Sequence, residues 1–127
     1  MLLNISNHPS HQWSEKQLQA AIADWNGVID YQFPAVPASA STADVIKMAE
    51  GIVEDLHSNE SYADVTAILI QGEFSLVINL ANMLKGVCEI VVATSERNTI
   101  LNPDGSKTVK FDFCQFRTVF YHRFMED

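Results

Sequence analysis

Short apolar runs alternate with stretches of helical periodicity along the first 95 residues of the chain. The runs 1–6, 28–32, 64–70 and 89–93 predict strands, and the run 64–70 is β-branched and apolar, which is typical of a central strand buried on both faces in a parallel sheet. The segments between them repeat apolar residues at i, i+3 and i+4, which predicts amphipathic helices. We expect these helices to begin near Ser14, at Ser41 or Thr42, and at Phe74, and to end near Asn26, Asn59 and Gly86. The third helix is apolar nearly all round, which predicts that it is well buried.

The pattern changes after residue 93. Residues 102–105, Asn-Pro-Asp-Gly, are a strong turn signal between the segments 98–101 and 107–120. In the second segment phenylalanines alternate with polar residues, which predicts a β-hairpin buried on one face. Those phenylalanines favour a core or subunit-interface role over base stacking because little basic charge surrounds them. They are Phe111, Phe113, Phe116 and Phe120.

Together these elements predict one α/β domain, 1–127, with βα units in 1–95 and a hairpin and tail in 96–127. The fold class is a three-layer Rossmann-like domain with a mainly parallel sheet, because right-handed βαβ crossovers give a strand order of about 2-1-3-4 with the hairpin at one edge. The strand order reverses between the first and third strands. Ligands of such sheets bind outside the carboxyl ends of the strands at that point, which selects 6–10, 71–74 and 94–98.

Composition narrows the class of partner. Sixteen acidic and eight basic residues give a net charge of −8, which disfavours duplex nucleic acid. The sequence lacks a basic leader, a membrane-length apolar run and a metal-ligand cluster, so we expect a cytoplasmic protein without membrane partner, metal or cofactor. Cys88 and Cys114 each lie in an apolar run, which predicts buried free thiols in a reducing compartment.

The turn Gln71-Gly72-Glu73-Phe74 opens the third predicted helix. Its backbone N–H groups and the positive end of the helix dipole would suit a phosphate or carboxylate. Alternatively, Gly72 only makes a tight turn and Glu73 is a favourable acid in the first helical turn.

The loop after the first strand holds Ser6, Asn7 and His8. The imidazole of His8 has the chemistry to donate to a phosphate or to act as general acid or base, although a turn-stabilising role is the alternative. Trp13 would either stack on a base or pack against the following helix.

Arg97 follows the fourth predicted strand beside Thr94 and Ser95, where its guanidinium would suit bidentate contact with a phosphate. The alternative is a salt bridge to Glu96 or Glu73.

A family resemblance rests on Leu-Asn-Ile-Ser-Asn-His-Pro-Ser at the start, the central Gly-Glu-Phe turn, Ala-Thr-Ser-Glu-Arg-Asn, and the hairpin segment Asp-Gly-Ser-Lys-Thr-Val-Lys-Phe-Asp-Phe. The chain resembles small CRISPR-associated Rossmann-like proteins related to the CARF-domain and ring-nuclease group, which serve antiviral defence. Members bind, and some cleave, cyclic oligoadenylates across a two-fold dimer interface. The resemblance implies a homodimer whose pocket is lined by His8, Gly72 and residues 94–97.

Cleavage in that group implies a metal-independent phosphodiesterase in which the ribose 2′-hydroxyl attacks its own phosphate. The candidate catalytic residues here are His8, Arg97 and Glu73. Glu73 disfavours an anion beside it, which weakens the case for catalysis more than the case for binding. A second hypothesis is therefore a non-catalytic Rossmann-like module that uses its crevice or hairpin for protein interaction or dimerisation.

Overall fold

The computed structural model describes residues 1–120, which form an α/β domain with the predicted order of elements. Two 3-10 turns, Ser10–Gln12 and Glu60–Tyr62, lie in loops. The remaining elements are β1 (Leu2–Ser6), α1 (Glu15–Trp25), β2 (Val28–Gln32), α2 (Thr42–Ser58), β3 (Ala67–Gln71), α3 (Phe74–Leu84), β4 (Glu89–Leu101) and β5 (Lys107–Thr118).

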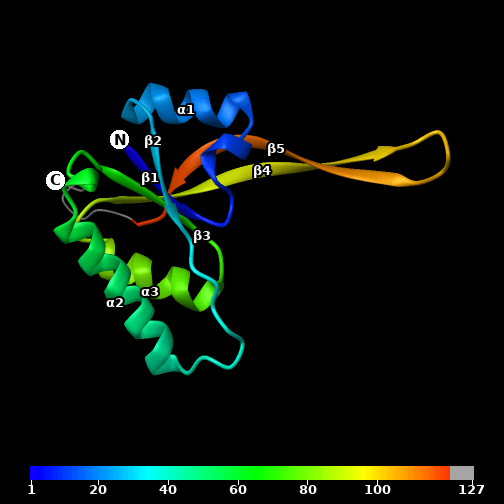
Figure 1. Ribbon diagram of the computed structural model, residues 1–127. Coiled ribbons are helices and arrows are strands. Elements are labelled where there is room, and N and C mark those ends of the chain that lie inside the picture. Colours follow the sequence, from blue (N-terminus) through cyan, green and yellow to red (C-terminus); the bar gives the residue numbers. More distant parts are fainter. Residues whose placement is uncertain (121–127) are drawn as a thin grey trace.

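The five strands form one sheet in the order β2-β1-β3-β4-β5. The first four strands are parallel, and β5 pairs antiparallel with β4. Figure 1 shows α1 on one side of the sheet and α2 and α3 on the other. The predicted fold class and strand order are confirmed, and the order reverses between β1 and β3.

The helices start where the sequence places their caps. The Ser14 hydroxyl accepts the backbone N–H of Gln17 at the start of α1. At the start of α2, Ser41 and Asp44 form a reciprocal capping box. Asn26 ends α1 in the left-handed conformation at φ 66°, which asparagine tolerates better than most residues.

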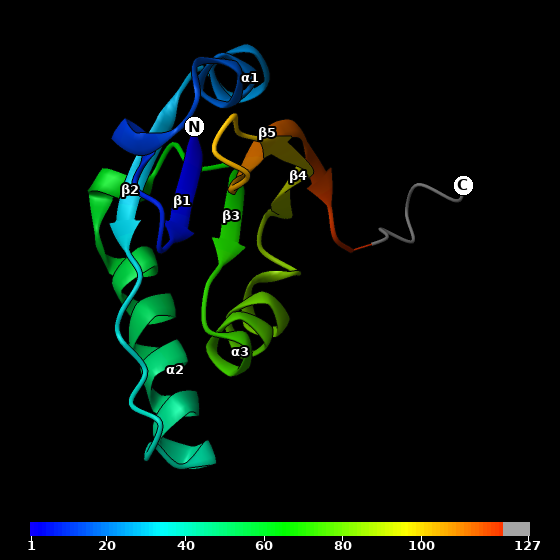
Figure 2. The same ribbon diagram turned by 90° about the vertical axis from the view of Figure 1, so that its right-hand side faces the viewer.

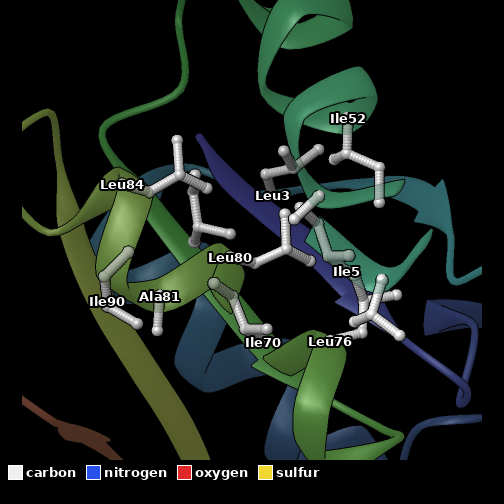
Figure 3. Close-up of a cluster of buried hydrophobic side chains, with 12 residues drawn as sticks. Leu3, Ile5, Ile52, Ile70, Leu76, Leu80, Ala81, Leu84 and Ile90 are labelled. Carbon is white, nitrogen blue, oxygen red and sulfur yellow. The ribbon is translucent and has the colours of Figure 1, made fainter. Parts of the chain in front are cut away.

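Strand side chains alternate between two cores. Leu3 and Ile5 of β1 point toward α2 and α3, where the larger core also takes in Ile52, Leu80 and Leu84 (Figure 3). The smaller core lies under α1 and contains Leu2, Ala21, Ala67, Leu69 and Val91. The next two side chains that β1 turns toward α1 after Leu2 are polar, namely Asn4 and Ser6, and both are buried.

Three sequence expectations differ from the structure. Strand β4 does not end at Ala93 but continues to Leu101, because residues 95–101 pair with 107–113 across the hairpin. Helix α3 is buried on one side only, since Phe74 and Ile78 on its other side are 75% and 53% exposed. Cys114 is exposed and Cys88 is half-buried, so the expectation of two buried thiols was wrong. The predicted tail after residue 120 lies outside the described residues.

The β4–β5 hairpin extends beyond the layers of the domain as a two-stranded ribbon (Figure 1), which points toward the viewer in Figure 2. Its register shifts between Thr94 and Ser95, where Ser95 pairs with Phe113 and leaves Cys114 as the extra residue. The extra residue breaks the alternation of side chains along β5. Phe113 and Phe116 therefore lie on the same face of the sheet although they are three positions apart. Within residues 1–120 no helix is long and apolar enough to cross a membrane.

Candidate functional site

A hollow of about 510 Å³ opens at the carboxyl ends of β1 and β3, on the α1 side of the sheet. This is the point where the strand order reverses, the usual place for ligands in open parallel sheets. The sheet supplies Ser6, Leu69, Gln71, Ala93 and Ser95, the first loop and the start of α1 supply His8, Gln12, Trp13, Ser14 and Gln17, and β5 supplies Phe111 and Phe113. Five residues predicted from the sequence therefore meet here: Ser6, His8, Trp13, Gln71 and Ser95.

A buried polar network fixes the loop that carries His8. The side-chain amide of Asn4, only 1% exposed, donates to the His8 carbonyl and to Asp30 Oδ1, both at 2.9 Å. The Ser6 hydroxyl donates to Asn4 Oδ1 at 2.7 Å and accepts the His8 backbone N–H at 3.2 Å. Asp30 also accepts the backbone N–H and the hydroxyl of Ser10. These bonds use the polar atoms of Ser6 and Asn4 internally and leave the imidazole of His8 exposed at the hollow.

Trp13 packs against the α1-side core and also lines the hollow, while base stacking on its ring stays a prediction. Its indole N–H donates to the His8 carbonyl at 3.0 Å, and its ring packs against Phe116 with 5.9 Å between centroids. Phe116 in turn contacts Phe113 at 5.0 Å. The aromatic wall of the hollow is thus held from behind by the α1-side core, while Trp13 and Phe113 also face the hollow.

Gln71 closes the gap where β3 and β4 diverge. Backbone pairing between these strands ends at Leu69 and Val91. Beyond that point the Gln71 side-chain amide takes over, since its Nε2 donates to the Ala93 carbonyl at 3.3 Å and its Oε1 accepts the Ala93 N–H at 3.2 Å. The polar groups of Gln71 are therefore occupied by the sheet, and Gln71 shapes the floor of the hollow.

The start of α3 is capped by its own glutamate. Glu73 is the N-cap residue, and its carboxylate accepts the backbone N–H groups of Ser75 and Leu76 and the Ser75 hydroxyl. These hydrogen bonds, that from the Ser75 hydroxyl first, lower the pKa of Glu73. Glu73 thus takes the backbone N–H groups that the sequence predicted as donors to a phosphate at this turn. Glu73, Gly72 and Phe74 all lie outside the lining of the hollow.

Gly72 is required by its neighbour rather than by a ligand. A Cβ built at Gly72 would lie 2.6 Å from the ring of Phe33, in the loop after β2. Van der Waals contact needs about 3.5 Å or more, so any side chain there displaces the ring.

Arg97 lies on the ribbon, beyond the hollow but on the same face. It pairs with Phe111 across the two strands, and residues directly opposite one another in an antiparallel pair share a face. Because Phe111 lines the hollow, the exposed Arg97 opposite it lies next to the mouth of the hollow. Among residues 1–120, Arg97 forms no salt bridge with Glu96 or Glu73. Thr94 points to the opposite face, and Asn7 is exposed outside the lining.

The electrostatics of the hollow differ from those of the chain as a whole. His8 is the one histidine among the described lining residues, and no carboxylate lies among them. Ser14 and Gln17 place the start of α1 at the wall, where the positive end of its dipole favours an anion. Residues 1–120 hold no cluster of three metal-ligating side chains. The lining thus has aromatic faces, hydroxyl and amide groups and no carboxylate, while Glu15 lies in the adjoining first turn of α1.

Sequence reasoning missed seven of the lining residues as site residues: Gln12, Ser14, Gln17, Leu69, Ala93, Phe111 and Phe113. It predicted an anion-attracting helix start, but at α3 instead of α1. The capping serine at position 14 was visible in the sequence, yet nothing local shows that α1 begins beside the carboxyl ends of β1 and β3.

Comparisons with known proteins address the family rather than the ligand. No curated protein and no solved structure matches the chain. One family model does, described as "Uncharacterized protein MJ1673 family", and its match covers residues 1–117, from β1 to the end of β5 but for one residue. This span includes every residue that lines the hollow. The chain therefore belongs to the MJ1673 family.

Proposed function

We propose that the hollow binds an adenine nucleotide unit, and that the physiological ligand is a cyclic oligoadenylate of the kind used in CRISPR-associated antiviral signalling. The observation that carries this proposal is the carboxylate-free, aromatic-walled hollow at the strand-order reversal of a protein whose net charge is −8. Its volume of about 510 Å³ suits a small ligand. The sequence resemblance supplies the identity of the ligand class.

Base recognition falls to the rings of the wall. Trp13 is partly exposed and held by Phe116, so its ring offers a fixed surface on which a base can stack, whereas Phe113 is only 6% exposed and supports the wall from behind. Stacking of a base on an aromatic side chain contributes about 1–3 kcal/mol. The side-chain amides of Gln12 and Gln17 at the rim are available to the polar edge of the base.

Phosphate recognition falls to the donor groups that border the hollow. The start of α1 and the imidazole of His8 border the hollow, and Arg97 extends from the adjacent ribbon. A cyclic ligand contains several nucleotide units, so one unit occupies the hollow and the next phosphate lies toward Arg97. The guanidinium would hold that phosphate bidentately.

Cleavage, if it accompanies binding, uses His8. The ribose 2′-oxygen attacks the adjacent phosphorus, the bond from phosphorus to the 5′-oxygen breaks, and a 2′,3′-cyclic phosphate forms. Neutral imidazole accepts the proton of the 2′-hydroxyl, and the 5′-oxygen leaves with a proton from solvent. Glu73 takes no part, because its carboxylate caps α3.

Equilibrium titration with cyclic tri-, tetra- and hexa-adenylate tests the proposal, with product analysis by mass spectrometry. His8→Ala and Arg97→Ala should each weaken binding by at least tenfold. The matched controls are His11→Ala, in the same loop but outside the lining, and Lys110→Ala, on the opposite face of the ribbon. Both controls should bind like the parent protein. Absence of binding to all three ligands by folded protein, or equal losses in the controls, would contradict the proposal.

A second candidate function is that of a protein-interaction or dimerisation module. It is favoured by the ribbon, where Phe111 and Leu101 are 67% and 70% exposed. This candidate does not compete for the same atoms as the ligand, except at Phe111. Sedimentation velocity of the purified protein between 1 and 100 µM, on the order of typical interface affinities, distinguishes a monomer from a dimer.

A further inference from the structure

Strand β5 forms one edge of the sheet, and this edge is long. Its twelve residues pair with β4 on one side, and within residues 1–120 no strand pairs with the other side. Alternate backbone N–H and C=O groups of an edge strand point outward, where another chain can pair with them. The stretch 107–111 is exposed at every position and lies on the ribbon, beyond the layers of the domain (Figure 1). This edge is therefore open to a further strand.

Two charged side chains decide which strand fits the edge. Lys110 and Asp112 lie on one face of β5, 3.8 Å apart, with 66% and 46% of their side chains exposed. A lysine on an edge strand usually prevents pairing, because like charges directly opposite each other repel. Here an acid stands two positions away on the same face. A strand fits if it presents an acid opposite Lys110 and a cation opposite Asp112, and an antiparallel copy of β5 does so.

The charges also select the register of such a pair. When two copies pair antiparallel about a two-fold axis, residues equally far before and after the axis residue lie opposite each other. An axis at Lys110 or Asp112 places two like charges opposite each other, and an axis at Val109 or Phe113 leaves both charges opposite neutral residues. An axis at Phe111 places Lys110 of each copy opposite Asp112 of the other. It also places Val109 opposite Phe113 on the other face of the strand.

The hairpin itself creates a need for a second cation beside Asp112. Glu96 of β4 lies directly opposite Asp112, and two carboxylates in that relation repel each other. Lys110 of the same strand balances one of these two charges. In the register with its axis at Phe111, Lys110 of the other copy lies on the open side of Asp112. Since Lys110 is paired with Asn98 within the hairpin, it introduces no acid of its own on that row.

The opposite edge of the sheet is a poorer partner for its own copy. It is formed by β2, which has five residues, and an axis at the middle of this strand places Asp30 opposite Asp30 of the other copy. The carboxylate oxygens of Asp30 are also bonded to Asn4 and Ser10. Self-pairing is thus matched at β5 and mismatched at the centre of β2.

We infer that two copies of this chain pair through the outer edges of their β5 strands, antiparallel and with the two-fold axis at Phe111. The two ribbons then form four strands in the order β4-β5-β5-β4. A single two-stranded hairpin is marginally stable in water, whereas three or more strands support one another. The two-fold axis makes each contact twice and closes the assembly. The paired stretch ends before Cys114, where the bulge breaks the alternation of β5.

This pairing is independent of the nucleotide proposed above, and it gives a surface to the dimerisation considered as a second function. It uses the edge of the sheet and leaves both faces open, so Phe111 keeps its place in the lining of the hollow. Arg97 lies on β4, one strand inside the edge. Lys110→Ala should therefore weaken the dimer and leave nucleotide binding unchanged, so that the two proposals can fail separately.

Charge reversal tests the edge and its register. Lys110→Asp and Asp112→Lys each turn two attractive pairs of the dimer into repulsive ones, which should raise the dissociation constant in sedimentation velocity by roughly tenfold or more. The matched control is Lys107→Asp, which changes the net charge as Lys110→Asp does but lies opposite the neutral Gln115 in this register. It should leave the constant within about threefold of the parent, as expected for an exposed charge without a direct partner. A parent that is monomeric at about 100 µM, on the order of weak transient interfaces, or an equal loss in the control overturns the inference.

Mixing the two single variants separates contacts between chains from contacts within one chain. Each variant alone carries like charges at positions 110 and 112. In the heterodimer of Lys110→Asp with Asp112→Lys, every acid at these positions lies opposite a lysine of the other copy. An equimolar mixture should therefore contain more dimer than either variant alone. The double variant Lys110→Asp/Asp112→Lys should likewise recover the dimer by itself. No gain on mixing overturns the edge pairing.

Both substituted side chains are exposed, so the variants are expected to fold. Circular dichroism melts check this, and the neutral variants Lys110→Gln and Asp112→Asn should weaken the dimer in the same direction by a smaller factor. Added salt should narrow the difference between Lys110→Asp and the parent, because screening weakens both attraction and repulsion between exposed charges. A difference that widens with salt would overturn the inference.

Discussion

The buried network around Asn4 yields a prediction whose magnitude follows from its hydrogen bonds. Asn4→Ala removes two bonds between neutral groups, to His8 and Ser6, and one to the Asp30 carboxylate. At about 1 kcal/mol for each neutral bond and about 2 kcal/mol for the charged one, the free energy of unfolding falls by roughly 4 kcal/mol. The His8 carbonyl still accepts from Trp13, which reduces the expected loss to about 3 kcal/mol.

The assay is urea unfolding followed by tryptophan fluorescence. With a slope of about 1.5 kcal/mol per molar, the midpoint should fall by roughly 2 M. The control is Asn7→Ala, an exposed neighbour in the same loop, for which a change within about 0.5 kcal/mol is expected. A midpoint for Asn4→Ala within 0.3 M, on the order of the control, would refute the view that this network holds the loop.

A shape-conserving variant adds a pH dependence to the same prediction. Asn4→Asp places a carboxyl group beside Asp30 in a buried position, so both desolvation and the like charge raise the folded-state pKa of the new carboxyl. The folded state then binds its proton more tightly than the unfolded state does. The stability deficit should be small near pH 4 and should grow as the pH rises toward 7. A deficit that shrinks with rising pH would contradict this reasoning.

Three further predictions concern single positions. Gly72→Ala should lower the free energy of unfolding by about 1–3 kcal/mol through overlap with Phe33, and the double-mutant cycle with Phe33→Ala should show strong coupling. Glu73→Ala should lower the Tm at pH 7; because the folded-state pKa of Glu73 is lowered, the contribution disappears as the pH falls below the ordinary glutamate value of about 4.3. In thiol labelling at pH 8, on the order of the ordinary cysteine pKa, Cys114 should react first, because burial raises the pKa of Cys88 to about 11. Full additivity of Gly72→Ala and Phe33→Ala, a pH-independent Tm difference for Glu73→Ala, or equal labelling rates of the two cysteines would count against the respective prediction.

Much of the fold could be predicted from the sequence because it depends on local signals. The buried parallel strands are continuous apolar runs, and Ser14 and Ser41 mark helix starts by their capping chemistry. The strand order follows from the right-handedness of βαβ crossovers, which no single residue has to encode.

The hairpin with its turn at residues 102–105 was predicted, but the continuation of β4 through residues 94–98 could not be, because this pairing is not encoded in the local sequence. Residues 94–98, Thr-Ser-Glu-Arg-Asn, read as a polar loop, yet they form a strand through pairing with residues 110–115. The bulge at Ser95 shifts β5 by one residue, and the pattern of phenylalanines alone does not reveal that shift. The extent of β4 in turn decides where Arg97 lies.

The position of the candidate site could be predicted from the topology, but the hydrogen bonds of its residues could not. The topology brings Ser6 and Gln71 to one edge of the sheet, as expected for the ends of adjacent parallel strands. The use of their polar atoms was not visible in the sequence, since Gln71 binds the backbone of a strand 22 residues away and Glu73 caps its own helix.

Nuclear magnetic resonance of the indole N–H groups tests the central claim most directly. The chain has two tryptophans, and both pack against Phe116, but only Trp13 lines the hollow. In a ¹H–¹⁵N spectrum titrated with cyclic tetra-adenylate, the account predicts a saturable shift of the Trp13 signal while that of Trp25 stays in place. Absence of any shift at millimolar ligand, on the order of the weakest specific affinities, or equal shifts of both signals, would contradict nucleotide binding in the hollow.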